Sequence, residues 1–216
     1  MPCAIICDYD GTLVDTETLL ELANHDLCAM HGKPYDSKLV RARVMARPDP
    51  EYTQGIREVC DIPGPLAEVI EERLAIYFRL QDERGVLPKL GADACLRAWH
   101  ERQIPIAVAS SSSRMHVQHM LKRLGWSELV RAVIGPEDVE QGKPAPDMYL
   151  KAAEAVGCAP QDCIAIEDAP AGVASAKSAG MFVIGLLDER YVSALPGADA
   201  VVKTWQEVAS VVASRM

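Results

Sequence analysis

Ala4-Ile5-Ile6-Cys7-Asp8-Tyr9-Asp10-Gly11-Thr12 runs from four apolar residues directly into two carboxylates and a Gly-Thr turn. Side chains alternate along a strand, so Asp8 and Asp10 lie on the same side, with their Cα atoms about 7 Å apart. Two carboxylates at this spacing repel each other unless a cation or a shared proton intervenes. The pattern therefore indicates a site for a divalent cation with oxygen ligands, and two solvated aspartates in a polar loop are the alternative.

The composition is that of an ordinary globular protein. Of 216 residues, 49% are hydrophobic and 25% are charged, which is enough for one large domain or for one domain with a smaller inserted unit. The net charge of −9 and the lack of a basic stripe argue against a nucleic-acid partner. An anionic substrate is still compatible with this charge, because a metal ion and one or two cationic side chains can reverse the field locally.

The cysteines favour a reducing compartment. They are odd in number, scattered, and mostly inside apolar runs: Cys3, Cys7, Cys28, Cys60, Cys95, Cys158 and Cys163. We expect reduced thiols rather than a disulfide framework, and no zinc site, because no Cys-x-x-Cys pair is present. The sequence has no basic leader followed by a long apolar segment and no run long enough to span a membrane, so a cytoplasmic protein without a membrane partner is expected.

Residues 15–85 follow a helical pattern throughout. Apolar residues recur at helical spacing in four segments, which are separated by turns at Gly32, at residues 47–50 and at residues 62–65. No alternating strand pattern interrupts them. The stretch predicts a helical unit of about four helices, inserted directly after the first strand.

From residue 86 onward, apolar strand-like runs alternate with helical segments. This order predicts parallel strands covered by helices on both faces: an α/β, doubly wound parallel-sheet (Rossmann-like) core made of residues 1–14 and 86–216. The expected strands after the first are 104–109, 130–134, 163–166, 182–186 and 200–202.

Polar residues follow three of these buried runs, at the point where each run ends. Asp8 follows the first, Ser110 follows the run 104–109, and Glu167 with Asp168 follows the run 163–166. Ligands of open parallel sheets bind outside the carboxyl ends of the strands. If these strands are neighbours, the polar residues meet in one crevice.

Each of these groups has a functional and a structural interpretation. Ser110 and Ser111 offer hydroxyl and backbone N–H groups to an anion, or they belong to a serine-rich helix N-cap. Lys143, in a loop stiffened by two prolines, is either a fixed positive charge for a phosphoryl group or a surface lysine. Glu167 and Asp168 either meet a metal or hydrogen-bond donors, or simply favour a helix N-terminus.

Taken in this order, the segments resemble the haloacid dehalogenase-like hydrolase superfamily over nearly the whole chain. The inserted unit is similar to the helical cap (residues 15–85) of the branch that contains β-phosphoglucomutases and small sugar-phosphate phosphatases such as pseudouridine-5′-phosphatase. The resemblance is carried by four ordered motifs: Asp8-x-Asp10-Gly11-Thr12, Ser110, Lys143-Pro144, and Glu167-Asp168 followed by Gly172.

The resemblance implies an aspartyl-phosphate mechanism with Mg²⁺. Asp8 would attack phosphorus, and Asp10 would protonate the leaving oxygen and then take a proton from water. Mg²⁺ would be bound by Asp8, by the backbone carbonyl of Asp10 and by Asp168, with Glu167 as a further ligand or an outer partner. Because dehalogenases lack the second aspartate of the first motif, Asp10 favours a phosphatase.

The resemblance also assigns the phosphate and substrate contacts. Ser110, Ser111 and Lys143 would bind the phosphoryl oxygens. Arg47 lies in Met45-Ala46-Arg47-Pro48, where that branch has a substrate-facing cap loop, and is the candidate reader of the leaving group; a surface arginine is the alternative.

The predicted function is a Mg²⁺-dependent phosphatase for a small phosphorylated metabolite, such as a sugar phosphate, acting as a monomer. A β-phosphoglucomutase-like phosphotransferase is the first alternative, but Leu20 stands where those mutases carry a cap histidine, and His25 lies half a helix away. A receiver-like module that accepts phosphate on an aspartate is a more distant alternative, because such modules are about half this length and lack a helical insert.

Overall fold

The computed structural model describes residues 3–44 and 50–216 and divides the chain into two compact units. The first unit combines Met1–Asp15 with Leu87–Met216, and the second is Thr16–Val86. The first contains the β-sheet, and the described residues of the second form helices joined by turns, without a strand.

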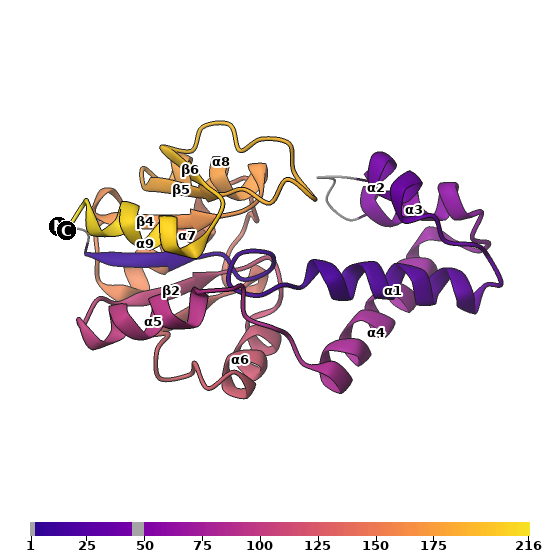
Figure 1. Cartoon of the computed structure of the whole chain (residues 1–216), viewed down its shortest axis with the longest axis horizontal. Helices are drawn as coiled ribbons and strands as arrows, with labels where there is room; N and C mark the ends of the chain where they lie inside the picture. The colour runs from indigo at the N-terminus through magenta and orange to yellow at the C-terminus, as the bar shows by residue number, and fades with distance from the viewer. Residues whose placement is uncertain (1–2, 45–49) are drawn as a thin grey trace. The chain divides into compact units, whose positions relative to one another are not determined.

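The sheet of the first unit is six-stranded and parallel, in the order β3-β2-β1-β4-β5-β6 (Figure 1). Its strands are β1 (Ala4–Cys7), β2 (Ile106–Ala109), β3 (Ala132–Ile134), β4 (Cys163–Glu167), β5 (Phe182–Leu186) and β6 (Ala200–Val202). The interior strands β1 and β2 are buried at every residue, which explains their uninterrupted apolar sequences. The predicted doubly wound α/β fold is confirmed.

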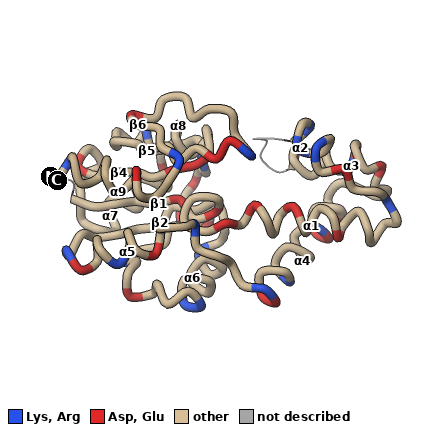
Figure 2. Tube along the Cα trace, in the orientation of Figure 1, with Lys and Arg blue, Asp and Glu red and all other residues tan. Residues whose placement is uncertain are grey.

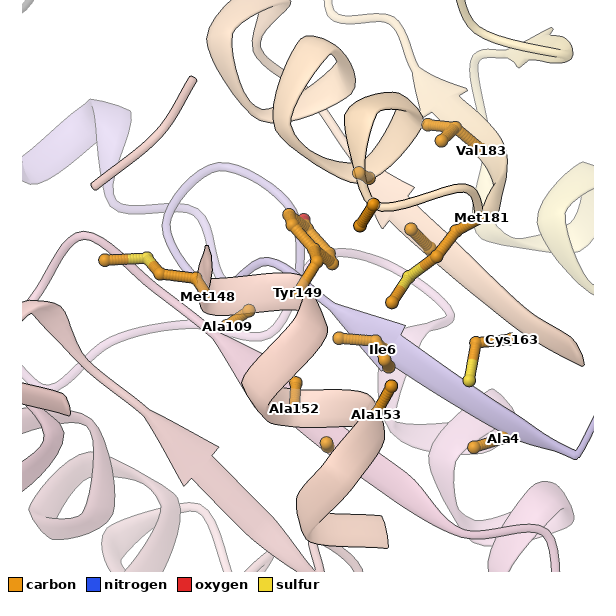
Figure 3. Close-up of a cluster of buried hydrophobic side chains, with 14 of the residues drawn as sticks. Ala4, Ile6, Ala109, Met148, Tyr149, Ala152, Ala153, Cys163, Met181 and Val183 are labelled. Carbon is orange, nitrogen blue, oxygen red and sulfur yellow. The ribbon is translucent and has the colours of Figure 1, made fainter. Parts of the chain in front are cut away.

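Helices cover both faces of this sheet. On one face α7 (Asp147–Val156) and α8 (Pro170–Ser178) pack on Ala4, Ile6 and their neighbours, as Figure 3 shows for α7. Helices α5 (Ala92–Glu101) and α9 (Trp205–Ala213) pack together through Trp99 and Trp205, whose ring centroids lie 6.0 Å apart. The remaining elements of this unit are α6 (Arg114–Arg123), which contacts β3, and the 3-10 turns η1 (Pro136–Asp138) and η2 (Pro160–Asp162).

The second unit consists of α1 (Glu17–Met30), α2 (Ser37–Val44), α3 (Glu51–Cys60) and α4 (Leu66–Arg84). Its own apolar core includes Leu27, Val40 and Ile56. A helical insertion was predicted at this place in the chain, and its described residues contain no strand. Arg47, the candidate substrate reader, lies outside the described residues.

The expectation that all seven cysteines are reduced is wrong. Cys3, just before β1, forms a disulfide with Cys158, just after α7, and their Cα atoms are 5.9 Å apart. The two lie side by side because β1 is central and α7 packs against it, a proximity that a separation of 155 residues does not reveal. The other five cysteines are free and buried.

The surface of the described residues carries both signs of charge. Figure 2 shows Lys and Arg interspersed with Asp and Glu along the chain. Among the helices of residues 3–44 and 50–216, none combines the length and the apolar character needed to cross a bilayer.

Candidate active site

The carboxyl ends of β2, β1 and β4 lie next to each other, because β1 pairs with both of the other strands. Asp8 follows β1, and its backbone N–H donates to the carbonyl oxygen of Ile166 on β4 at 2.9 Å. Ser110 follows β2, and Glu167 is the last residue of β4. The three predicted strand ends therefore meet at one edge of the sheet.

Lys143 joins these strand ends. Its Nζ donates to Asp8 Oδ1 and to Glu167 Oε1, both at 2.6 Å, and to the carbonyl oxygen of Ala109 at 2.9 Å. An ammonium group has three hydrogens, so these acceptors use all of them. Because the Lys143 side chain is only 7% exposed, the surface-lysine interpretation does not apply.

Tyr149 completes this group from the inner face of α7. Its hydroxyl donates to Glu167 Oε1 at 2.6 Å, and Lys143 Nζ lies 5.3 Å from the centre of its ring. All four side chains are almost entirely buried. We call Asp8, Lys143, Tyr149 and Glu167 the enclosed cluster.

Burial and charge shift the pKa values in the enclosed cluster. Burial raises the pKa of Asp8; Lys143 opposes this shift, Glu167 and Asp10 add to it, and the pKa reaches about 7. Burial alone lowers the pKa of Lys143, but the two carboxylates outweigh it and keep the pKa above its ordinary value. Lys143 therefore stays charged at neutral pH. One positive charge then faces two carboxylates, which is an incomplete compensation.

Asp10, in the loop after β1, is less buried than Asp8 and contacts the loop that follows β2. Its Oδ2 accepts hydrogen bonds from Ser112 Oγ at 2.7 Å and from Ser110 Oγ at 3.4 Å. The Ser110 hydroxyl also accepts from the backbone N–H of Ser112 at 3.0 Å. We call Asp10, Ser110 and Ser112 the serine side.

The other two serines of this loop differ from each other. Ser113 is the N-cap of α6, and its Oγ accepts the backbone N–H of His116 at 3.4 Å. Ser111, a predicted phosphate contact, has an exposed side chain. Its place at the strand end leaves both its hydroxyl and its N–H as candidate donors to an anion.

Asp168 and Glu167 each lie against a glycine. Thr12 Oγ1 donates to Asp168 Oδ1 at 2.9 Å, and a Cβ on Gly11, whose φ is +77°, would overlap the Asp168 carboxylate. A Cβ on Gly172, in the first turn of α8, would overlap the Glu167 carboxylate. Both glycines make room for an acid, which explains why side chains are absent at these two positions.

Asp8, Glu167 and Asp168 form a group that fits a divalent cation. Each offers a carboxylate oxygen, and these oxygens all lie within 4.8 Å of one another. Three carboxylates at this spacing concentrate negative charge, two of them share Lys143, and oxygen donors of this kind suit Mg²⁺. The Asp10 carboxylate is not part of this group; the expected Asp10 ligand is its backbone carbonyl.

Sequence reasoning missed Ser112, Tyr149 and Thr12. Ser112 stands in a run of four serines, and the sequence does not distinguish them. Tyr149 lies within the apolar cluster on the buried side of α7, and the sequence gives no sign that its hydroxyl reaches Glu167. Thr12 is fully buried two residues after Asp10, and its place inside the first motif was the available signal.

Comparisons with known proteins agree with this geometry. The family model of haloacid dehalogenase-like hydrolases matches residues 4–180. The chain is 33% identical over 201 residues to a validoxylamine A 7'-phosphate phosphatase of Streptomyces hygroscopicus subsp. limoneus, covering 93% of each chain. It is 32% identical to a fructose-1-phosphate phosphatase of Escherichia coli, covering 82% of this chain and 92% of that protein.

A solved structure shows the same fold. The crystal structure of a putative β-phosphoglucomutase from Thermotoga maritima superposes with a TM-score of 0.82 at 27% identity, covering 99% of each chain. The family match extends over strands β1 to β4 and the helical insertion, from β1 to the end of α8. The chain is therefore an enzyme that belongs to the haloacid dehalogenase-like hydrolase family.

Proposed function

We propose that this enzyme is a Mg²⁺-dependent phosphatase that hydrolyses a small phosphomonoester, such as a sugar phosphate, through an aspartyl-phosphate intermediate. The observation that supports this most is the joining of Asp8, Glu167 and Lys143 by 2.6 Å hydrogen bonds beside a second aspartate. This arrangement supplies a buried nucleophile, a compensating charge and a separate acid–base group.

Asp8 is the proposed nucleophile. One of its oxygens attacks phosphorus, the bond to the leaving oxygen breaks, and the phosphoryl group becomes bound to the carboxylate. Water then attacks the aspartyl phosphate, which releases orthophosphate and regenerates Asp8. Burial favours the first step, because the charge of the carboxylate becomes dispersed when the new bond forms.

Asp10 is the proposed acid–base group. It protonates the departing alkoxide in the first step and removes a proton from the attacking water in the second. Both serine hydroxyls donate to its Oδ2. The serines are neutral and Asp10 is only partly buried, and these surroundings support its assignment as the acid–base group.

Asp8, Glu167 and Asp168 are the proposed ligands of Mg²⁺, together with the backbone carbonyl of Asp10. When bound, Mg²⁺ neutralises negative charge on the phosphoryl group and on the carboxylate that approaches it. The excess of carboxylates over lysine in the enclosed cluster supports this assignment. A cation at this place would also reduce the repulsion between an anionic substrate and the Asp8 carboxylate.

Lys143, Ser110 and Ser111 are the proposed contacts of the phosphoryl oxygens. Lys143 already uses its three hydrogens, so a phosphoryl oxygen must replace one of its present acceptors. Asp8 is the acceptor we expect to be replaced, because it loses its charge when it becomes esterified. The Lys143 ammonium group would then donate to a phosphoryl oxygen instead of to Asp8 and stabilise the negative charge there.

The substrate class rests on the relatives. Relatives of similar sequence include phosphatases named for a validoxylamine phosphate and for fructose-1-phosphate. Both are small phosphorylated, hydroxyl-rich compounds, and we propose a substrate of this class. Arg47 stays a proposed substrate contact, and closure of the helical unit (Thr16–Val86) as a cap is likewise a proposal.

The test is a panel of phosphorylated metabolites assayed for orthophosphate release with Mg²⁺, and again with EDTA. We expect release from at least one sugar phosphate or related ester, and loss of release with EDTA. Absence of orthophosphate release from every ester would contradict the proposal.

A mutase is the second candidate, favoured by the structural similarity to a putative β-phosphoglucomutase. Leu20 on α1 argues against it, because it stands where those mutases carry a histidine. The two reactions differ in product: a mutase gives an isomeric sugar phosphate and little orthophosphate. A receiver-like phospho-acceptor would take up one phosphate per chain without turnover, so the same assay distinguishes all three.

The remaining expectations stay predictions. Five free cysteines favour a cytoplasmic location, whereas the Cys3–Cys158 disulfide is more typical of an oxidising compartment. A monomer without nucleic-acid or membrane partners is our expectation for the assembly.

A further inference from the structure

The Glu167 carboxylate accepts hydrogen bonds and is also a proposed ligand of the cation, so its two oxygens must be divided between these roles. Its Oε1 accepts hydrogen bonds from both Lys143 and Tyr149, each at 2.6 Å. A carboxylate oxygen has two favourable acceptor directions, so these two donors occupy Oε1. Its Oε2 has one long contact, from the backbone N–H of Ala169 at 3.4 Å. Oε2 is therefore the oxygen left for a cation.

Tyr149 is well suited to fix this division. It is fully buried on α7, and its hydroxyl points away from Ala152 and Ala153 of the same helix (Figure 3). Gly172 limits the carboxylate from another side, because a side chain there would overlap it. The Glu167 carboxylate thus has little freedom to rotate.

We infer that Tyr149 is a positioning residue for the cation site, which keeps Oε1 of Glu167 on Lys143 and thereby presents Oε2 to Mg²⁺. The inference rests on the proposed function, because it assumes that Asp8, Glu167 and Asp168 bind a divalent cation. Tyr149 touches neither the phosphoryl group nor the cation in this role. It acts only through Glu167, as hydrogen-bonding partners of metal ligands do.

Tyr149→Phe tests the inference, because it removes the hydroxyl and keeps the ring that packs in the core. Mg²⁺ binding is measured by isothermal titration calorimetry on the substrate-free protein, so the readout does not depend on activity. We expect the Kd for Mg²⁺ to rise about 10-fold to 100-fold, the range typical for the loss of such partners. In turnover assays the Mg²⁺ concentration for half-activation should rise in parallel, while kcat at saturating Mg²⁺ changes less.

Tyr9→Phe is the matched control. Tyr9 is buried to the same extent, but its hydroxyl has no hydrogen-bond partner among the described residues. This variant should bind Mg²⁺ as the wild type does. Equal Mg²⁺ affinity of Tyr149→Phe and the wild type would overturn the inference, as would a lower melting temperature of Tyr149→Phe with unchanged Mg²⁺ binding.

The outcomes separate this inference from the proposed function. If the wild type binds no Mg²⁺, both the cation site and the role of Tyr149 are wrong. If the wild type binds Mg²⁺ and releases orthophosphate but Tyr149→Phe does the same at equal Mg²⁺, only the inference fails. If Mg²⁺ binding weakens in Tyr149→Phe but no ester is hydrolysed, the inference holds and the phosphatase proposal fails.

Discussion

The enclosed cluster and the serine side lie at the ends of adjacent strands, yet they surround their carboxylates in opposite ways. In the enclosed cluster, two buried carboxylates share one ammonium group. On the serine side, one partly exposed carboxylate, Asp10, accepts bonds from two neutral hydroxyls. The first arrangement leaves negative charge uncompensated in a buried place, and the second holds a partly exposed carboxylate between neutral hydrogen-bond donors. The difference teaches that two aspartates close together in the sequence can be suited to different roles, the proposed nucleophile and the proposed acid–base group, by their surroundings alone.

The largest effect should come from removing the nucleophile. Asp8→Asn keeps the shape of the side chain but cannot form the aspartyl phosphate, so we expect turnover to fall at least ~10³-fold, the scale seen for removed nucleophiles. The measurement is orthophosphate release from a substrate found in the panel. Asp162→Asn, which changes an exposed carboxylate before β4, is the control. An Asp8→Asn protein with the wild-type rate would refute the mechanism.

Removing the ammonium group of Lys143, which Asp8 and Glu167 share, should destabilise the enclosed cluster. Lys143→Met leaves Asp8 and Glu167 buried without their positive partner, which costs about 3–5 kcal/mol. For a protein of this size that corresponds to a fall in melting temperature of roughly 10 °C. The measurement is thermal unfolding in EDTA, repeated with Mg²⁺, which should recover part of the loss by supplying positive charge.

Lys151→Met provides the comparison for that experiment, because Lys151 lies on the exposed side of α7. It should change the melting temperature by little, as surface substitutions do. Similar losses for both lysines would show that Lys143 contributes no more than an ordinary surface charge.

The incomplete compensation at Asp8 also predicts a pH dependence of stability. Because the pKa of Asp8 is raised to about 7 in the folded protein, the folded state keeps a proton that the unfolded chain has released between about pH 4 and pH 7. The free energy of unfolding of the metal-free protein should therefore rise as the pH falls through this window, by at most about 1.4 kcal/mol per pH unit from this group.

Denaturant titrations in EDTA at several pH values measure this slope. Asp8→Asn removes the titrating group, so its free energy of unfolding should depend less on pH than that of the wild type. Other groups titrate in both proteins and cancel in the comparison. Identical pH slopes would mean that Asp8 has an ordinary pKa.

The smallest effect is expected on the serine side. Ser112→Ala removes the 2.7 Å hydrogen bond to Asp10, and we expect kcat to fall about 10-fold, the loss expected for one hydrogen bond to a charged group. Ser113→Ala is the matched control: it should cost about 1 kcal/mol of stability through the lost N-cap and leave kcat unchanged. A rate loss in Ser113→Ala equal to that in Ser112→Ala would remove the distinction between the two serines.

The fold was predictable because its signals are local. Buried strands such as Ala4–Cys7 and Ile106–Ala109 are short apolar runs in the sequence. The helical insertion is marked by apolar residues that recur at helical spacing after residue 15. The meeting of Asp8, Ser110 and Glu167 was predictable as well, because parallel strands end on the same edge of a sheet.

The contacts that were missed depend on geometry that a sequence does not carry. Which of four consecutive serines binds Asp10 is decided by the direction of the chain after β2. The Cys3–Cys158 disulfide depends on how α7 packs beside β1. Tyr149 carries an apolar ring and a polar hydroxyl. The helical spacing of apolar residues predicts burial of the ring but not the hydrogen bond from the hydroxyl to Glu167.

The disulfide has a practical consequence for handling the protein. It joins a residue near the amino terminus to one 155 positions later, so any single proteolytic cut between them leaves two fragments in one covalent molecule. Such nicked material would migrate as intact protein on a denaturing gel without thiol and would separate into two bands with it. Purity judged under only one of these conditions would be misleading.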